Sequence, residues 1–230
     1  MRSRDVVRAA IGFILYVLGV PVVLFVAAGT LNWPMAWVYV ALFWLSTLGS
    51  RLIVLRRNPD TLRERARFTA SEGTPAWDRV LSLTVGLVGP LAMTIVAGLD
   101  HRFGWSRSIA DGWQVLATVV VAYGYGMAVW AMVANPYFGA VARIQEDRGH
   151  RVVTNGPYRV VRHPSYAGAL LAALDFPFML EALWALIPAL LMIVALVVRT
   201  ALEDRMLRRE LDGYKEYAEQ IRYRLIPGIW

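Results

Sequence analysis

Residues 7–28 read VRAAIGFILYVLGVPVVLFVAA, and Arg8 is the one charged side chain among them. An α-helix needs about 20 predominantly apolar residues to cross the hydrocarbon core of a bilayer. The stretch reaches that length, is too long for the apolar core of a signal peptide and lacks a clear cleavage site. It therefore predicts a first transmembrane helix that the mature protein retains.

Five further apolar segments follow along the chain, at residues 35–55, 80–99, 113–134, 165–179 and 183–198. The segment 165–179 is short, and Pro177 should stop or kink its helix because proline lacks the N–H that a helix interior needs. Together with 183–198 it predicts a tight helical hairpin. Hydrophobic residues make up 57% of the 230, and the mean hydropathy is +0.46. We therefore predict an all-α integral membrane protein with about six transmembrane segments.

The basic residues alternate between the two ends of these segments. Arg2, Arg4 and Arg8 precede the first segment, six arginines lie in the connection at about 56–79, and the stretch before residue 165 and the tail are also basic. Cytoplasmic loops of membrane proteins carry the excess of Lys and Arg. Both termini and the basic connections are therefore predicted to be cytoplasmic, and the compact, arginine-rich chain favours a bacterial inner membrane.

Composition excludes several kinds of site. The chain has no cysteine, which removes disulfides, thiolate catalysis and Cys-based metal sites. His101, His150 and His163 do not have the spacing of a metal-binding helix. The net charge of +7 lies mainly beside apolar segments, where it indicates topology and contact with lipid headgroups rather than with nucleic acid. We predict neither a metal nor a nucleic acid as a partner.

The chain is predicted to form a single membrane domain over residues 1–230. Residues 1–134 would form four spans with a cytoplasmic loop at about 56–79, and residues 135–230 would form the functional core. Within that core, two polar stretches at roughly 135–165 and 199–230 would assemble into a cytoplasmic cap. Gly124 and Gly126 lie inside a predicted membrane helix, where they indicate helix packing rather than nucleotide binding.

The stretch TNGPYRVVRHPSYAG, residues 154–168, carries the first candidate site. Pro164 suits the first position of a helix, which would place His163 at the N-cap. The free N–H groups at that helix start, with Arg162 beside them, would attract a carboxylate or a phosphate. The alternative is that Arg159 and Arg162 contact lipid phosphates at the membrane surface.

The second candidate site begins where the last apolar segment ends. Arg199 and Glu203 are four residues apart, so they share a helix face and could pair with each other. The predicted hairpin returns them to the level of His163. The alternative is a surface ion pair that contributes less than about 1 kcal/mol.

These two stretches together resemble a known family. GHRVVTNGPYRVVRHPSYAG, residues 149–168, and RTALEDRMLRRELDGYKEY, residues 199–217, are similar to the isoprenylcysteine carboxyl methyltransferases and their prokaryotic relatives. That family has an R-H-P-x-Y motif, a helical hairpin, a paired-acid motif and a Y-x-x-Y tail in this order. A wider circle of membrane phospholipid and thiol methyltransferases shares the first motif. The resemblance covers about residues 135–230, and the paired acid here is Glu203-Asp204 rather than two glutamates.

The resemblance implies a membrane-embedded methyltransferase that uses S-adenosylmethionine and releases S-adenosylhomocysteine. It implies that Arg199 orients the substrate and that Arg199 and Glu203 form the catalytic pair. The cofactor contacts that it implies are Gln145, His150, Val152, Val153, Tyr158, His163, Pro164, Ser165, Tyr166 and Glu203.

The methyl acceptor implied by the resemblance is a lipophilic small molecule or prenyl-type lipid with a carboxylate or thiol. A carboxylate needs no general base, which agrees with the lack of a Ser–His or His–Asp pattern. The first alternative is a phospholipid N-methyltransferase. An alternative of another class is a non-catalytic membrane transporter or sensor, although Pro21, Pro90 and Pro188 lack the charged neighbours expected at a transport site.

Overall fold

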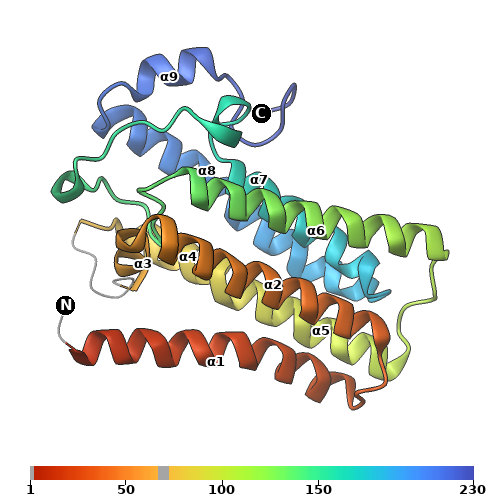
Figure 1. Cartoon of the computed structure of the whole chain (residues 1–230). Helices are drawn as coiled ribbons and strands as arrows, with labels where there is room; N and C mark the ends of the chain where they lie inside the picture. Colours follow the sequence, from red (N-terminus) through yellow and green to blue (C-terminus); the bar gives the residue numbers. More distant parts are fainter. Residues whose placement is uncertain (1–2, 67–72) are drawn as a thin grey trace.

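The computed structural model describes residues 3–66 and 73–230, and these form helices joined by loops, without a strand. Arg2 and residues 67–72, the middle of the predicted loop at 56–79, lie outside the described residues. The all-α membrane architecture predicted from the sequence is confirmed for the described part of the chain. Figure 1 shows long helices lying side by side with a smaller group of elements at one end.

The helices of the first half follow the predicted apolar segments closely. They are α1 (Ser3–Ala28), α2 (Pro34–Arg57), the short α3 (Pro59–Ala66), α4 (Ala76–Leu83), a π-helical turn η1 (Thr84–Val88), α5 (Gly89–Phe103) and α6 (Asp111–Ala134). The elements of the second half are the 3₁₀ turns η2 (Glu146–Arg148) and η3 (Gly156–Arg159), then α7 (Pro164–Met179), the 3₁₀ turn η4 (Leu183–Ala185), α8 (Leu186–Glu210) and α9 (Tyr214–Gln220).

Within the described residues, five helical stretches are long and apolar enough to cross a membrane. They are Ala10–Ala28, Pro34–Arg57, Ala76–Phe103, Asp111–Ala134 and Leu183–Glu210. The other predicted segment, 165–179, forms α7, which has 16 residues and ends two residues after Pro177. At about 1.5 Å per residue it spans about 24 Å, less than the ~30 Å hydrocarbon core. The structure therefore supports five full-length spans and a shorter α7 paired with α8.

The third span is continuous but not a regular α-helix. The π-helical turn Thr84–Val88 lies between α4 and α5, directly before Gly89 and Pro90. Pro90 has no N–H to donate to the carbonyl four residues earlier, and π turns are one way in which a helix adapts to such a break. We attribute the turn to Pro90.

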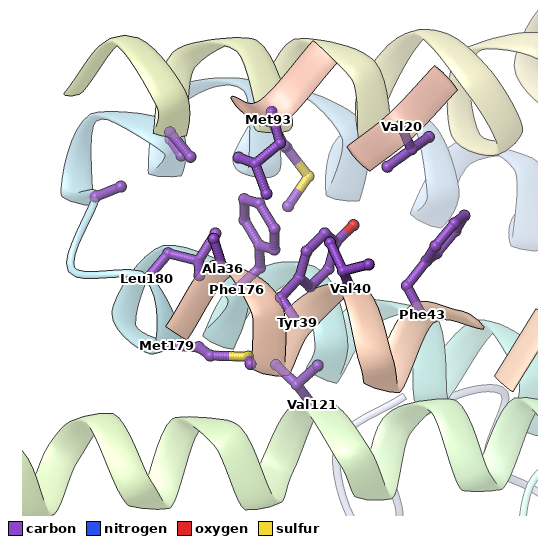
Figure 2. Packing of buried hydrophobic residues seen from close by; sticks show 14 of the residues in the cluster. Val20, Ala36, Tyr39, Val40, Phe43, Met93, Val121, Phe176, Met179 and Leu180 are labelled. Carbon is purple, nitrogen blue, oxygen red and sulfur yellow. The ribbon is translucent and has the colours of Figure 1, made fainter. Parts of the chain in front are cut away.

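The helices bury a shared apolar core away from the cap. Tyr39 and Val40 of α2, Val121 of α6 and Phe176 of α7 belong to one cluster of buried side chains, and Figure 2 shows them converging with Met93 of α5. The outer faces of the same helices remain apolar and exposed in the chain alone. Such an outer surface fits contact with lipid.

Two glycines allow α6 and α7 to approach each other closely. A Cβ at Gly124 would lie 2.5 Å from the carbonyl oxygen of Gly168, and a Cβ at Gly168 would collide with the carbonyl of Gly124 in turn. A Cβ at Gly126 would meet no atom within 4 Å. The packing role that the sequence predicts for Gly124 is therefore confirmed. The same prediction for Gly126 is wrong.

The polar stretches 135–165 and 199–230 fold together at one end of the bundle, and we call this body the cap (Figure 1). The backbone N–H groups of Arg162 and His163 donate to the carbonyls of Tyr223 and Arg224, at 3.0 and 2.9 Å. These bonds tie the chain just before α7 to the end of the tail. The cap is thus assembled from segments about 60 residues apart in the sequence.

Candidate functional site

A cavity of about 1930 Å³ lies between the cap and the membrane helices. Its walls come from the loop after α6, the start of α7, the second half of α8 and α9, and also from α1, α2, α3 and α4. The cavity is therefore bounded by the cap on one side and by membrane-spanning helices on the other. A space of this kind can hold a polar and an apolar ligand next to each other.

The structure brings most of the sequence-predicted site residues to this one cavity. Those that line it are Gln145, His150, Val152, Val153, Tyr158, His163, Ser165, Tyr166, Arg199 and Glu203. Pro164 is buried in the first turn of α7 and is not part of the lining. Its place at the helix start, with His163 as N-cap, is as predicted.

The start of α7 presents two stacked rings to the cavity. The His163 and Tyr166 rings are nearly parallel, with centroids 5.6 Å apart. The Nε2 atom of His163 is buried and has no hydrogen-bond partner among the described residues, while Asp204 Oδ1 lies 3.6 Å away. The amides of Tyr166 and Ala167 already donate to the His163 carbonyl. An anion at this helix start would therefore find fewer free N–H groups than the sequence suggested.

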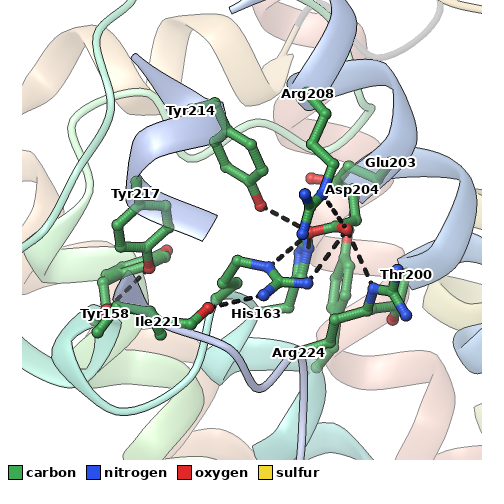
Figure 3. A network of polar contacts seen from close by, with 12 residues as sticks. Tyr158, His163, Thr200, Glu203, Asp204, Arg208, Tyr214, Tyr217, Ile221 and Arg224 are labelled. Carbon is green, nitrogen blue, oxygen red and sulfur yellow. Dashed lines mark hydrogen bonds and ion pairs between the residues drawn. The ribbon is translucent and has the colours of Figure 1, made fainter. Parts of the chain in front are cut away.

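Glu203 points toward α7 rather than along its own helix. Its Oε2 accepts a hydrogen bond of 2.6 Å from the hydroxyl of Tyr166, and Figure 3 shows it beside the Asp204 cluster. The other oxygen of the carboxylate remains an acceptor for hydroxyl or ammonium groups. Tyr166 and Glu203 thus join the two predicted motifs across the cavity.

Arg199 pairs with an acid that the sequence analysis did not single out. Its Nε donates to Asp78 Oδ1 at 2.8 Å, and an NH2 hydrogen reaches the carbonyl of Ala140 at 3.3 Å. Its guanidinium also lies 5.2 Å from the centre of the Tyr166 ring, within the range of a cation–π contact. The alternative of a surface ion pair between Arg199 and Glu203 is not what the structure gives, because Arg199 is paired with Asp78, a fully buried carboxylate on α4.

Asp78 accepts further hydrogen bonds besides the one from Arg199. Its side chain is fully buried, and its Oδ2 accepts hydrogen bonds from the Ser82 hydroxyl at 3.0 Å and the Ala142 amide at 2.6 Å. One carboxylate therefore connects α4, α8 and the loop after α6. The signal in the sequence was an aspartate two residues before the third apolar segment, which alone is too common to indicate a site.

Asp204 is the centre of a second ionic cluster (Figure 3). Its oxygens accept bonds from the Arg162 guanidinium at 2.7 and 3.2 Å, from Arg208 at 3.1 Å, from Arg224 at 3.0 Å and from the Tyr214 hydroxyl at 3.1 Å. Arg162 is only 4% exposed and also donates to the carbonyls of Ile221 and Arg222. Arg162 lines the cavity, but its charge is already balanced by the buried Asp204, whereas Arg159 is exposed. A role of Arg162 toward a ligand anion or a lipid phosphate stays a prediction.

The loop between α6 and α7 is fixed by its own polar contacts. Buried Gln145 donates from Nε2 to the Tyr137 carbonyl at 2.7 Å and accepts from Arg148 at its Oε1. The backbone N–H of Gln145 donates to His150 Nδ1 at 3.3 Å, which places the proton of a neutral ring on Nε2. Burial, with help from Arg148 and Arg143, lowers the pKa of His150 to about 4. His150 is therefore neutral at pH 7. Gln145 stabilises the loop through hydrogen bonds of both the nitrogen and the oxygen of its side-chain amide.

The tail packs on the same loop through its tyrosines. The hydroxyl of Tyr217 donates to the Tyr158 carbonyl at 2.8 Å, and the Tyr158 hydroxyl accepts from Asn135 at 3.2 Å. Val152 packs against the cluster that contains Tyr214 and Tyr217. The two tyrosines of the Y-x-x-Y sequence thus support the cavity wall near Tyr158 and Val152.

Residues 113–212 match the family model of the phospholipid methyltransferases. The matched range includes α6, α7, α8 and the whole loop that carries His150 and His163. No curated protein matches the chain. Over this range the chain is similar to the phospholipid methyltransferases, and its long helices are apolar enough to cross a membrane.

Proposed function

We propose that this protein transfers a methyl group from S-adenosylmethionine to a lipophilic acceptor that carries a carboxylate or a thiol. The observation that carries the proposal is the single cavity in which residues of the R-H-P-x-Y and Glu-Asp motifs meet and which continues between membrane helices. The cap would lie on the cytoplasmic side, in agreement with the basic residues beside it. Adenosylmethionine is a polar molecule, so a cytoplasmic opening suits its entry, while the acceptor would come from the bilayer.

The residues of the cavity fit such a cofactor. The buried, unpartnered Nε2 of His163 can make a hydrogen bond to a polar group, and the remaining oxygen of Glu203 can accept from ribose hydroxyls or from an ammonium. The parallel rings of His163 and Tyr166 offer a flat surface to the adenine or to a cationic sulfonium. Val152, Val153 and Tyr158 would enclose the apolar parts.

When bound, the cofactor would supply an electrophilic methyl group on a sulfonium. The chain's own part is to position the acceptor in line with that methyl group and to exclude water. Arg199, fixed by Asp78, would orient an anionic acceptor by hydrogen bonds. Because a carboxylate or thiolate already has a lone pair, the residues need not remove a proton.

A phospholipid N-methyltransferase is the second candidate, and the matched family favours it by its description. An amine acceptor would have to lose a proton, and His163, beside Asp204, is the group of the cavity wall that could accept it. An assay can distinguish the two candidate functions. The protein is incubated with labelled adenosylmethionine and a panel of prenyl thiols, prenyl carboxylates and phosphatidylethanolamine. Methyl esters release methanol in base, whereas N-methyl groups resist it, and the absence of transfer to any lipid would contradict both.

Replacing Glu203 with Gln is expected to lower the affinity for adenosylmethionine by about 10- to 100-fold, because a hydrogen bond to a charged group contributes about 1.5–3 kcal/mol. Titration calorimetry on the purified protein in detergent measures the change. Tyr166→Phe keeps the carboxylate and should lose less affinity. The exposed Glu216 provides the control, and Glu216→Gln should bind as the wild type does. Unchanged affinity in Glu203→Gln would remove Glu203 from the cofactor site.

A further inference from the structure

The large cavity continues beyond Arg199 to a region lined by α1, α2 and α3. Phe13 and Tyr16 of α1, Arg51 of α2 and Arg65 of α3 form its walls there. A smaller cavity of about 190 Å³ is lined by the same four residues and continues along Ser46, Thr47 and Ser50 of α2 and Val129 of α6. The space therefore extends between α1, α2 and α6.

Two arginines in this region have no acidic partner among the residues that the structure describes. Arg143, Arg162 and Arg199 each bind a carboxylate at 2.6–2.8 Å, whereas neither Arg51 nor Arg65 forms an ion pair with a described residue. The Nε of Arg65 is buried without a hydrogen-bond partner among the described residues, and within the same part of the chain its NH1 reaches only the Gly139 carbonyl, at 3.4 Å. Buried polar atoms are rarely left unsatisfied, so this one indicates a ligand or a water.

The surroundings of both guanidinium groups are aromatic. Arg51 lies 4.8 Å from the centre of the Phe13 ring and Arg65 lies 5.4 Å from that of Phe138. Burial lowers the pKa of Arg65 to about 9, with smaller contributions from Arg51 and Arg199. Arg65 is still protonated at pH 7, so the two cations repel each other and would be stabilised by an anion between them.

The pair also lies where a lipid headgroup would be. Arg51 is six residues before the end of α2, and Arg65 is in α3, which follows it at the cap end of the bundle (Figure 1). Leu15 and Leu18 of α1 and Leu52 of α2 are exposed on the outside of these helices. Acyl or prenyl chains would contact such a surface while a charged group turned inward.

We propose that Arg51 and Arg65, with the hydroxyl of Tyr16, bind a phosphate or carboxylate of the lipid acceptor, separate from the atom that is methylated near Arg199. The apolar chain of the acceptor would lie along the smaller cavity between α1, α2 and α6. The assignment of this lipid as the acceptor rests on the proposed methyl transfer. The binding of an anionic lipid at this site does not depend on the proposed methyl transfer.

Binding can be measured without cofactor, by titrating the full chain in uncharged detergent with hexadecyl phosphate, hexadecanol or inorganic phosphate. The wild type should bind hexadecyl phosphate at least tenfold more tightly than either of the others. Arg51→Gln and Arg65→Gln should lose that preference, and Arg65→Lys, which keeps the charge, should retain part of it. The control Arg57→Gln changes an exposed arginine of the same helix and should behave as the wild type does.

Three results would overturn the site. They are equal affinity of the wild type for hexadecyl phosphate and hexadecanol, equal affinity for hexadecyl phosphate and inorganic phosphate, and the same loss in Arg57→Gln. Unchanged thermal unfolding and adenosylmethionine affinity show that the Gln variants are folded. If the Gln variants do not fold, the affinity of the Arg65→Lys variant for hexadecyl phosphate tests the site instead.

A second arm tests the assignment to the acceptor. The ratio of kcat/KM for an anionic over a neutral prenyl acceptor should fall at least tenfold in Arg65→Gln and stay constant in Arg57→Gln. If the binding arm succeeds and this ratio does not change, the site holds a bound membrane lipid and the acceptor assignment is wrong. If no acceptor is methylated at all, the proposed function fails while the binding result stands.

Discussion

Replacing Arg199 with Ala is expected to lower kcat/KM for the acceptor by about 100- to 1000-fold, as the loss of one positioned donor to a reacting group does, and to change adenosylmethionine affinity by less than about threefold. The guanidinium is held at 2.8 Å by Asp78 and lies 5.2 Å from the centre of the Tyr166 ring. Initial rates and calorimetry on the same preparations give the two quantities. Equal losses in both would place Arg199 in the cofactor site.

Asp78 provides the control for this variant, because Arg199→Ala leaves a fully buried carboxylate without its partner. Removing both partners of a buried pair is far less damaging than removing one. The double variant Asp78→Ala/Arg199→Ala should therefore recover thermal stability but not turnover. Recovery of turnover would show that Arg199 has only a structural role.

Replacing Asp204 with Ala is expected to destabilise the cap by about 3–5 kcal/mol, because it leaves the buried Arg162 guanidinium without a counter-charge. Arg208, Arg224 and the Tyr214 hydroxyl lose the same partner. Thermal unfolding in detergent should show the loss. Hydrogen exchange should show faster exchange of the Arg162 and His163 amides, which bond to the tail.

The matched control is Glu210→Gln, an exposed acid at the end of the same helix, which should leave stability within about 0.5 kcal/mol of the wild type. Unchanged amide exchange in Asp204→Ala would show that the tail is held by its apolar contacts alone. The Asp204 cluster would then contribute little to the cap.

The helices could be predicted well because hydropathy and proline directly determine where a membrane helix can lie. The expected segment 113–134 corresponds to α6, Asp111–Ala134, and 35–55 to α2, Pro34–Arg57. The π-helical turn before Pro90 could not be predicted, since composition does not reveal how a helix adapts to a missing N–H. The last membrane-spanning helix, α8, runs to Glu210, as expected from the helical continuation of the charged tail.

The site could be predicted less well, because local spacing identifies neighbours on one helix but not partners from distant ones. Arg199 and Glu203 do share a face, yet Asp78, 121 residues earlier, and Tyr166 on α7 are the groups they bind. Arg162 lines the cavity, but its charge is balanced by Asp204. Turn, helix-start and spacing signals pointed to the two motifs, whereas the full set of cofactor contacts came from a family resemblance. The roles of these residues toward a cofactor remain predictions.

The bond between Asp78 and Arg199 also constrains how this protein can have evolved. Arg199 lies inside the matched range 113–212 and Asp78 lies outside it. The matched segment, recombined with an unrelated set of preceding helices, would carry a buried guanidinium without its carboxylate, at a considerable cost in stability. The helices before the matched range and the segment inside it are therefore expected to be inherited together.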